Sequence, residues 1–472
     1  MLRATVDPAL AKAVLTMGET KRIFIDPRQD VWDPWSVLPT ASQMIAHGDD
    51  EWVALARAAR VPVHVLSVGR FGTPHDNDAA LDRKAVQAFA EMAWRNPYTN
   101  DPATIEDVIS YLADWRDWLE GSATISVACG MAWWKRDEIR RLLWHPRRPL
   151  KFVRRAKTAL AQAIKAQGGV AIWPSRVSPK LLSDAKQQKV SLIRVEDGFI
   201  RSTGLGVNLV PPSSIIVDRT GIHYDPSQPN DLETILNYDA VPGRLIERAR
   251  SLRKAIVRAG ISKYSADIPG LSPLARSERR LVLVAGQVED DMSVLTGGGG
   301  LQSNLELLRR VRALEPDSEL WYRPHPDVDS GHRKGSVSDS DLLVYADRIV
   351  RGGSMAALLD TVDCVHVLTS LTGFEALLRK REVACHGTPF FAGWGLTTDF
   401  AAIPLRRSRK LTLDALVAGA LIRYPRYLDP LTGLPCPPEV LVSRMAGSSA
   451  GNRLDWIEPL RRWQGKMTTI LR

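Results

Sequence analysis

Cysteine is scarce in this chain of 472 residues, which has only Cys129, Cys364, Cys385 and Cys436. No Cys-x-x-Cys pair occurs, and this argues against a disulfide scaffold and against a zinc site. No stretch reaches the roughly 18 consecutive apolar residues of a membrane span. The first residues lack an apolar core followed by a small-residue cleavage site, so they do not read as a signal peptide. We therefore expect a protein of the reducing cytoplasm.

Acidic residues are outnumbered by basic ones, 53 against 63, which gives a net charge of +10. Such a balance favours anionic partners, and a nucleotide sugar, an acidic glycan or an anionic membrane surface would each fit. No zinc-finger, RRM or KH signature is present, so we predict no nucleic-acid partner.

The length predicts two or three domains. Residues 1–95 form an N-terminal extension of unassigned role, with an expected helix at 50–60 and an expected strand at 61–68. Residues 96–150 are predicted to be helical, with five tryptophans as packing anchors: Trp115, Trp118, Trp133, Trp134 and Trp144. The segment NPYTNDPATIEDVI (96–109) is echoed by DPLTGLPCPPEVLV (429–442), which suits descent from tandem modules.

From about residue 160, short apolar runs bounded by turn residues alternate with helical stretches. The runs are GGVAIWP, VSLIRVED, SSIIVD, RLVLVAG, ELWYRPHP, CVHVLTS and REVACHG. This pattern predicts an α/β protein with parallel sheets. A polar break near 262–280 divides the series into two Rossmann-like domains, at 151–272 and 273–425, followed by a tail at 426–472. Ligands of such sheets bind at the carboxyl ends of the strands.

The first motif, VEDGFIRS (195–202), follows a predicted strand and leads into a glycine-containing turn. Glu196 and Asp197 stand beside Arg194 and Arg201, and neighbouring cations can tune a carboxylate for acid/base work. A structural ion-pair turn explains the same residues equally well.

The second motif, GQVEDDMS (286–293), places three acids directly after an apolar strand and before the glycines 297–300. A nucleophilic carboxylate is one use of such acids. A metal site and a polar loop are the alternatives. We predict no metal, because no histidine or further aspartate stands at ligand spacing.

The third motif, RPHPDV (323–328), holds His325 between two prolines after a strand. This rigidity favours binding or catalysis over a structural role. The fourth motif, LTSLTGFEALLR (368–379), sets Ser370 and Thr372 at a helix N-terminus, which attracts phosphate. Ordinary capping, with Glu375 completing a capping box, predicts the same residues.

These four motifs and PFFAGWGLTTD (389–399), in this order and spacing, resemble the bacterial capsule β-Kdo transferases, which build a linker of 3-deoxy-manno-octulosonic acid (Kdo) on a lipid. The likeness runs from about residue 96 to 444. It is greatest to the second of the two catalytic modules of the tandem members. Only one such module is recognisable here, and residues 1–95 depart from the tandem pattern.

The resemblance implies a metal-independent GT-B fold with two Rossmann-like domains facing a cleft and a mainly helical N-terminal extension. It also implies CMP-Kdo as donor, no cofactor, a lipid-linked β-Kdo acceptor and retention of the β configuration. Retention through two inversions requires a carboxylate that forms a glycosyl-enzyme intermediate. Asp291 matches that position, with Asp290 as the fallback, and Glu196 or Asp197 is then the acid/base candidate.

The family's nucleotide-binding positions fall on eight residues of the last three motifs: Gln287, His325, Pro326, Thr369, Ser370, Thr372, Gly373 and Glu375. Arg194, Arg201 and Arg323 are our candidates for the Kdo carboxylate, because a guanidinium matches a carboxylate in bidentate fashion. This last assignment is not a motif match.

The tail at 453–472 has apolar residues at helical spacing with basic flanks. It predicts a helix that crosses between the two domains, and an inner-membrane surface is the alternative partner. A GT-B enzyme with another CMP-sugar donor, such as CMP-sialic acid, stays open as a function. So does a catalytically silent module of a capsule assembly complex.

Overall fold

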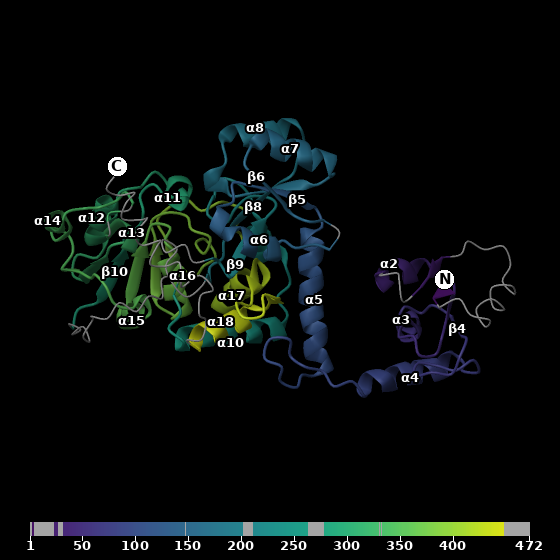
Figure 1. The fold of residues 1–472 in the computed structure, drawn as a ribbon. Coiled ribbons are helices and arrows are strands. Elements are labelled where there is room, and N and C mark those ends of the chain that lie inside the picture. Colours follow the sequence, from purple (N-terminus) through teal and green to yellow (C-terminus); the bar gives the residue numbers. More distant parts are fainter. Residues whose placement is uncertain are drawn as a thin grey trace. The chain divides into compact units, whose positions relative to one another are not determined.

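A computed structural model describes residues 2–3, 23–26, 32–146, 148–201, 211–262, 278–329, 331 and 333–447. The chain divides into two compact units, Met1–Val108 and Ile109–Arg472 (Figure 1). The glycine-containing turn expected after residue 202, most of the polar break at 262–280 and the helix expected at 453–472 lie outside the described residues.

The first unit contains a parallel four-stranded sheet in the order β2-β1-β3-β4. Its elements are β1 (Leu2–Arg3), β2 (Phe24–Ile25), α2 (Pro34–Val37), β3 (Met44–Ala46), α3 (Trp52–Ala58), β4 (Val63–Val65) and α4 (Asp78–Ala90). The expected helix and strand are confirmed as α3 and β4. Most residues of regular structure in this unit are helical, as predicted. The sequence pattern did not predict the small sheet.

The second unit begins with a seven-stranded sheet, which we call the N-terminal sheet, in the order β17-β16-β9-β8-β7-β5-β6. The strands are β5 (Ile125–Cys129), β6 (Lys151–Val153), β7 (Gly169–Ile172), β8 (Leu192–Asp197), β9 (Ser214–Asp218), β16 (Pro425–Leu428) and β17 (Pro435–Cys436). The strands from β6 to β8 in this order are parallel, whereas β9, β16 and β17 pair antiparallel. The sheet thus begins before residue 151, in the segment predicted to be helical, because ISVAC (125–129) is a fully buried strand.

The C-terminal sheet is wholly parallel, with the order β12-β11-β10-β13-β14-β15. The strands are β10 (Leu281–Ala285), β11 (Glu319–Arg323), β12 (Arg348–Ile349), β13 (Cys364–Val367), β14 (Glu382–Cys385) and β15 (Thr398–Asp399). This is the strand order of a Rossmann fold, with the switch point between β10 and β13. The runs LVLVA and CVHV are buried throughout, as expected of strands covered on both faces.

Helices cover both sheets (Figure 1). Those of the N-terminal half are α5 (Ile105–Ser122), α6 (Arg136–Leu142), α7 (Ala156–Lys165), α8 (Pro179–Gln187), α9 (Asp231–Tyr238) and α10 (Gly243–Arg258). Those of the C-terminal half are α11 (Met292–Gly297), α12 (Asn304–Leu314), α13 (Pro326–Asp329), α14 (Asp339–Leu342), α15 (Met355–Thr361) and α16 (Leu371–Leu378). The chain then runs through α17 (Leu413–Val417) and a π-helical turn (Ala418–Arg423) back to the N-terminal sheet, and α18 (Pro438–Ala446) follows.

Buried ion pairs join the two halves of the second unit. Glu233 of α9 pairs with Arg406 and Arg407, at 2.5 and 2.8 Å, and both Glu233 and Arg407 are buried. Breaking such a pair by removing one partner costs about 3–5 kcal/mol. These pairs therefore hold α9 of the N-terminal half against the segment that follows β15.

The internal echo has a structural counterpart. Asn96 accepts hydrogen bonds from the N–H groups of residues 98 and 99, and Asp429 accepts from those of residues 431 and 432. The helices α5 and α18 each begin nine residues after that side chain. The two segments are thus the same local motif, an Asx turn followed by a helix.

The tryptophans of residues 96–150 do not all act as packing anchors. Trp115 and Trp118 are half-buried and donate to main-chain carbonyls of Pro435 and Leu142. Trp133 and Trp144, however, are 66% and 55% exposed. The prediction was wrong for these two: Trp133 lies in the 3-10 turn Trp133–Lys135, and Trp144 follows the end of α6.

Candidate active site

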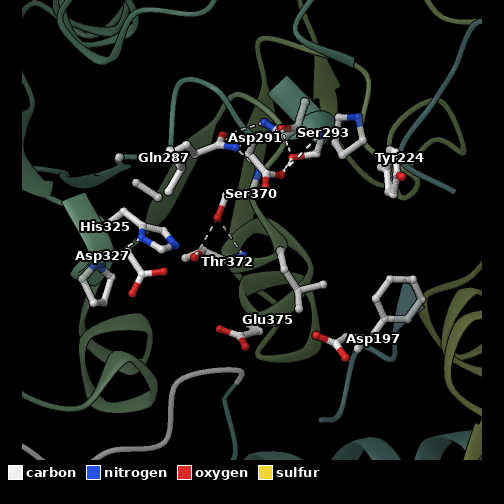
Figure 2. Close-up of a pocket in the computed structure, with 18 of the residues that line it drawn as sticks. Asp197, Tyr224, Gln287, Asp291, Ser293, His325, Asp327, Ser370, Thr372 and Glu375 are labelled. Carbon is white, nitrogen blue, oxygen red and sulfur yellow. Dashed lines mark hydrogen bonds between the residues drawn. The ribbon is translucent and has the colours of Figure 1, made fainter. Parts of the chain in front are cut away.

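A cavity of about 370 Å³ opens where strands of both sheets end (Figure 2). The N-terminal half contributes Ser175, Glu196, Asp197, Phe199 and Tyr224 to its lining, and the C-terminal half contributes Gln287, Asp291, Ser293, Arg323, His325, Pro326, Thr369, Ser370, Thr372 and Glu375. All four motifs therefore meet at one cavity, since each follows a strand that ends at that edge.

Asp291 stands at the N-cap of α11, and its carboxylate lies in the cavity. Its Oδ2 accepts hydrogen bonds from the N–H and the Oγ–H of Ser293, at 3.3 and 2.7 Å. Capping fixes the orientation of the carboxylate on the helix. The side chain also remains exposed, so it is both positioned and accessible.

A relay of hydrogen bonds ties Asp291 to the next strand of the C-terminal sheet. Nε2 of Gln287 donates to Oγ1 of Thr369 at 2.9 Å, and Oγ1 of Thr369 donates to Oγ of Ser293 at 3.3 Å. Oε1 of Gln287 accepts from the N–H groups of Thr369 and Ser370, at 2.7 and 3.1 Å. Gln287 is buried, and its side chain joins the turn after β10 to the turn after β13.

The turn after β13 leads into α16, whose N-cap is Ser370. Oγ of Ser370 accepts from the N–H of Thr372 at 3.2 Å and donates to its Oγ1 at 3.1 Å. With Ser370 as the N-cap, Glu375 is too far along the helix for the predicted capping box. Its buried side chain lines the cavity instead (Figure 2).

His325 is held by the chain that follows it. The N–H of Asp327 donates to Nδ1 of His325 at 3.1 Å. A neutral imidazole that accepts at Nδ1 carries its proton on Nε2. The ring lies on the side of the cavity that holds Ser370 and Thr372 (Figure 2). His325 and the N-terminus of α16 thus form a group of donors suited to a phosphate.

Asp197 is the centre of an ion-pair cluster at the end of β8. Lys135 approaches it at 2.8 Å and Arg201 at 3.1 Å, and both cations are buried. Burial lowers the pKa of Lys135, while the Asp197 carboxylate opposes that shift. Glu196 lines the same cavity, and its Oε1 accepts a hydrogen bond from the N–H of Asp197 at 3.1 Å. Because two ion pairs, at 2.8 and 3.1 Å, hold the Asp197 carboxylate, Glu196 is the stronger candidate for acid/base work.

Residues 169–269 and 263–427 match the model of a family described as capsule polysaccharide biosynthesis proteins. The chain belongs to this capsule polysaccharide biosynthesis family. The capsule polysaccharide modification protein LipA of Neisseria meningitidis is 39% identical over 358 residues, which are 74% of this chain and 50% of LipA. The lipopolysaccharide-processing protein LpsZ of Rhizobium meliloti is 46% identical over 52% of this chain and 56% of LpsZ.

Two solved structures resemble this member of the capsule family. A β-Kdo 2,7 transferase of KpsC from Thermosulfurimonas dismutans is 32% identical with a TM-score of 0.55, and covers 68% of this chain and 98% of its own. The β-Kdo 2,4 transferase of the same KpsC is 29% identical with a TM-score of 0.60, over 69% and 98%. The predicted family and the predicted GT-B-like fold are thereby confirmed. The chain spans about half the length of the curated relatives that it matches.

Several predicted residues of this capsule-family protein do not reach the cavity. Asp290 pairs with Arg333 at 3.0 Å and is absent from the lining. Arg194 donates to the carbonyl of Thr220, and Arg201 pairs with Asp197. The contacts with Arg333, with the Thr220 carbonyl and with Asp197 thus hold these three side chains outside the lining.

Arg323 and Gly373 make structural contacts that the sequence did not predict. Arg323 lines the cavity, but its guanidinium donates to the carbonyls of residues 350, 352 and 353, which braces the chain after β12. Burial lowers the pKa of Arg323. Gly373 is absent from the lining, and a Cβ there would lie 2.8 Å from the ring of Phe391. Glycine thus allows α16 to pack closely against Phe391, and the nucleotide-binding role of Gly373 stays a prediction.

Sequence reasoning missed Tyr224 and Lys135. The hydroxyl of Tyr224 is buried and has no hydrogen-bond partner among the described residues, although the side chain lines the cavity. Burial, and then the Glu196 and Asp291 carboxylates, raise the pKa of Tyr224, so the phenol stays a donor. The sequence GIHYDP carried no recognisable motif. Lys135 lay in a segment that was predicted only from its tryptophans.

Carboxylates of the cavity form no metal-binding group within the described ranges. The only such group there consists of Glu315, Cys364 and His366, at the amino end of β13 and thus at the opposite edge of the C-terminal sheet. Arg280 lies 3.6 Å from Glu315, which disfavours a cation at that place. None of the described helices is long and apolar enough to span a membrane.

Proposed function

We propose that this protein is a retaining glycosyltransferase that transfers Kdo from CMP-Kdo to a lipid-linked β-Kdo acceptor in capsule polysaccharide biosynthesis. The observation that carries the proposal is that Asp291 and Glu196, one from each sheet, line the same cavity. Two carboxyl groups on either side of a reacting sugar are what a two-step retaining transfer needs. The similarity to two β-Kdo transferase structures supports Kdo as the sugar.

In the first step a carboxylate oxygen of Asp291 attacks the anomeric carbon of Kdo. The bond from that carbon to the phosphate oxygen breaks, and CMP leaves with the electron pair. His325, Ser370, Thr372 and the N-terminus of α16 offer hydrogen-bond donors to the phosphate, whose negative charge grows as it leaves. The relay from Gln287 holds Asp291 in position for the attack.

In the second step an acceptor hydroxyl attacks the same carbon and displaces Asp291, so the configuration is inverted twice. Glu196 accepts the hydroxyl proton. Tyr224 donates a hydrogen bond to an oxygen of the sugar. No metal or cofactor takes part in this scheme. We also propose that the protein acts on the cytoplasmic side of the inner membrane, within a capsule assembly complex.

The test is intact-protein mass spectrometry after mixing with CMP-Kdo. Wild type is expected to gain the mass of one Kdo residue, and Asp291→Asn, which keeps the N-cap, is expected to gain none. Asp290→Asn is the matched control, since it removes the same charge one residue away, and should gain the mass as wild type does. A competing excess of CMP-sialic acid that suppresses the adduct would assign another donor. An adduct on Asp291→Asn would remove this residue from the mechanism.

A further inference from the structure

The two steps of the proposed reaction use different halves of the second unit. Asp291 and His325, which act on the donor, belong to the C-terminal half. Glu196 and Tyr224, which act in the transfer to the acceptor, belong to the N-terminal half. A displacement of about 1 Å between reacting groups costs on the order of 100-fold in rate. The second step therefore needs contacts that fix the two halves relative to each other near the cavity.

Helix α11 is held at both of its ends. At its N-cap the carboxylate of Asp291 lies in the cavity. At its other end the N–H of Thr388 donates to the carbonyl oxygen of Gly297 at 2.7 Å. A Cβ on Gly297 would lie 3.2 Å from Cγ2 of Thr369 and 3.3 Å from the carbonyl oxygen of Tyr224. Six residues of helix span about 9 Å, so the contacts at the far end also fix the place of Asp291.

Thr296 of α11 joins this helix to the N-terminal half. Its Oγ1 lies 2.8 Å from the carbonyl oxygen of Met292 and 2.9 Å from that of Tyr224. A threonine hydroxyl has one proton, so the two carbonyl oxygens share one donor. The contact with Met292 is the common one between a helical threonine and the carbonyl four residues before it. The contact with Tyr224 crosses from one half to the other, and the geometry of the helix does not require it.

Both halves also confine the chain beside Tyr224. The ring of His223 packs edge-on against Phe199 of the N-terminal half and Phe390 of the C-terminal half, with centroids 4.9 and 5.8 Å apart. Phe199 in turn stacks on Phe390 at 4.3 Å. The main chain at Tyr224 is therefore fixed by contacts with both halves, while its side chain lines the cavity.

The phenol of Tyr224 lies close to the two carboxylates that are proposed to react. Burial raises the pKa of Tyr224, and the Glu196 and Asp291 carboxylates raise it further. Asp291, Ser293 and Tyr224 lie on the same side of the cavity (Figure 2). Thr296 is not among the described residues that line the cavity, so it contacts Tyr224 from behind.

We propose that Thr296 is a positioning residue for the transfer step, because its hydrogen bond to the Tyr224 carbonyl sets the place of the Tyr224 hydroxyl relative to the sugar on Asp291. Thr296 touches no substrate and acts through Tyr224. This inference rests on the proposed function and adds to it a residue outside the cavity. Loss of the Thr296 hydroxyl should slow the second step and spare the first, whose groups all belong to the C-terminal half.

The experiment compares three variants of the full chain. Thr296→Val keeps the shape of the side chain and removes the hydroxyl, whereas Thr296→Ser keeps the hydroxyl and should rescue the function. Thr361→Val is the matched control. Oγ1 of Thr361 donates to the carbonyl of Ala357 at 2.9 Å, so this change removes the same intrahelical bond from α15 of the same half. Melting curves show whether all three fold like wild type.

The donor is CMP-Kdo and the acceptor is a synthetic β-Kdo glycoside. We expect Thr296→Val to lower the rate of transfer from the adduct to the acceptor about fivefold, the effect of one lost hydrogen bond. The rate of adduct formation should stay as in wild type. Thr296→Ser and Thr361→Val should keep both rates. An equal fall of both rates in Thr296→Val would overturn the proposal, since the change would then disturb α11 as a whole.

A double-mutant cycle tests whether Thr296 acts through Tyr224. In the Tyr224→Phe background, Thr296→Val should lower the overall rate of transfer by less than about twofold, because the hydroxyl that it positions is already absent. A loss as large as in the wild-type background would overturn the proposal. The cycle measures overall transfer, so it still decides on Thr296 if wild type forms no adduct and Asp291 is not the nucleophile.

Hydrogen exchange tests the contact itself without any substrate. Exchange of the amides in residues 221–226 should be faster in Thr296→Val than in wild type and unchanged in Thr361→Val. If CMP-Kdo is not a donor, the proposed function fails, and this measurement still tests the contact between the two halves. Unchanged exchange in Thr296→Val would overturn the inference, because Thr296 would then not hold Tyr224 in place.

Discussion

The two sheets that meet at the active site differ in the interactions that organise their carboxyl edges. The edge of the C-terminal sheet is organised by short hydrogen bonds among neutral groups, from Gln287 through Thr369 to Ser293, which end on Asp291. The edge of the N-terminal sheet is organised by charge, with Asp197 between two buried cations. The geometry of the C-terminal edge is fixed before a ligand binds, whereas the N-terminal edge supplies an electrostatic field.

This difference follows from what each edge is proposed to bind. A leaving phosphate needs donors at defined positions, and preorganised hydrogen bonds supply them without reorganisation. An acidic acceptor needs attraction over a longer range, which charged groups supply and which salt screens over about 10 Å at 0.1 M. Donor-side changes should therefore alter rates and be insensitive to salt, and acceptor-side changes should alter KM and depend on salt.

The largest effect is expected at His325 on the donor side. His325→Asn places an oxygen near the position of Nδ1 and so keeps the acceptor for the Asp327 N–H, but it loses the Nε2 donor. We expect the rate of adduct formation from CMP-Kdo to fall about 100-fold, the cost of losing one preorganised donor. His325→Gln places an amide near the position of Nε2 and should recover part of the rate. Equal rates in both variants would show that Nε2 is not the donor that matters.

A second prediction concerns the dependence of stability on pH, which we expect to originate in the C-terminal sheet. His366, on β13, and His386, after β14, lie 3.0 Å apart between Nδ1 and Nε2 in the C-terminal sheet. Burial lowers the pKa of each to about 4, with smaller contributions from Arg280 at His366 and from His366 itself at His386. An imidazole in the unfolded chain has a pKa of about 6.5. Between these values the unfolded chain binds more protons, so stability falls as pH decreases from 6.5 to 4 and then levels off.

We expect a loss of about 2 kcal/mol per histidine between pH 7 and pH 5. Urea unfolding at both pH values measures it, and hydrogen exchange should locate the lost protection in the C-terminal sheet. The variant His366→Gln/His386→Gln should show a smaller dependence on pH than wild type. If its dependence is the same, the histidine pair is not the origin.

The smallest effect is expected at Tyr224, a neutral donor on the side that otherwise relies on charge. Tyr224→Phe removes a buried hydroxyl without a described partner, so the free protein should be as stable as wild type or more stable. Transfer to the acceptor should fall about tenfold, as for one lost hydrogen bond to a charged transition state. Kinetics with melting curves measure both. A loss of stability together with activity would instead indicate a structural role for the hydroxyl.

Much of the fold could be predicted from local patterns. All seven apolar runs are strands, and six of them lie in parallel pairings, where residues buried on both faces must be apolar throughout. The strand β5 was missed because tryptophans and charged helices dominate the sequence around it. The antiparallel pairing of β9 and β16 was also not predicted, since it joins segments about two hundred residues apart and leaves no local signal.

The motifs determined which stretches of chain form the site, whereas the tertiary structure decided which side chains within each stretch reach it. The sequence offered Asp290 and Asp291, or Glu196 and Asp197, as equivalent neighbours. Asp291 lines the cavity whereas Asp290 pairs with Arg333; Glu196 and Asp197 both line it, but Asp197 is held by Lys135. Residue type and spacing indicate the chemistry of the site. The direction of each side chain is determined only when the two sheets pack around a common edge.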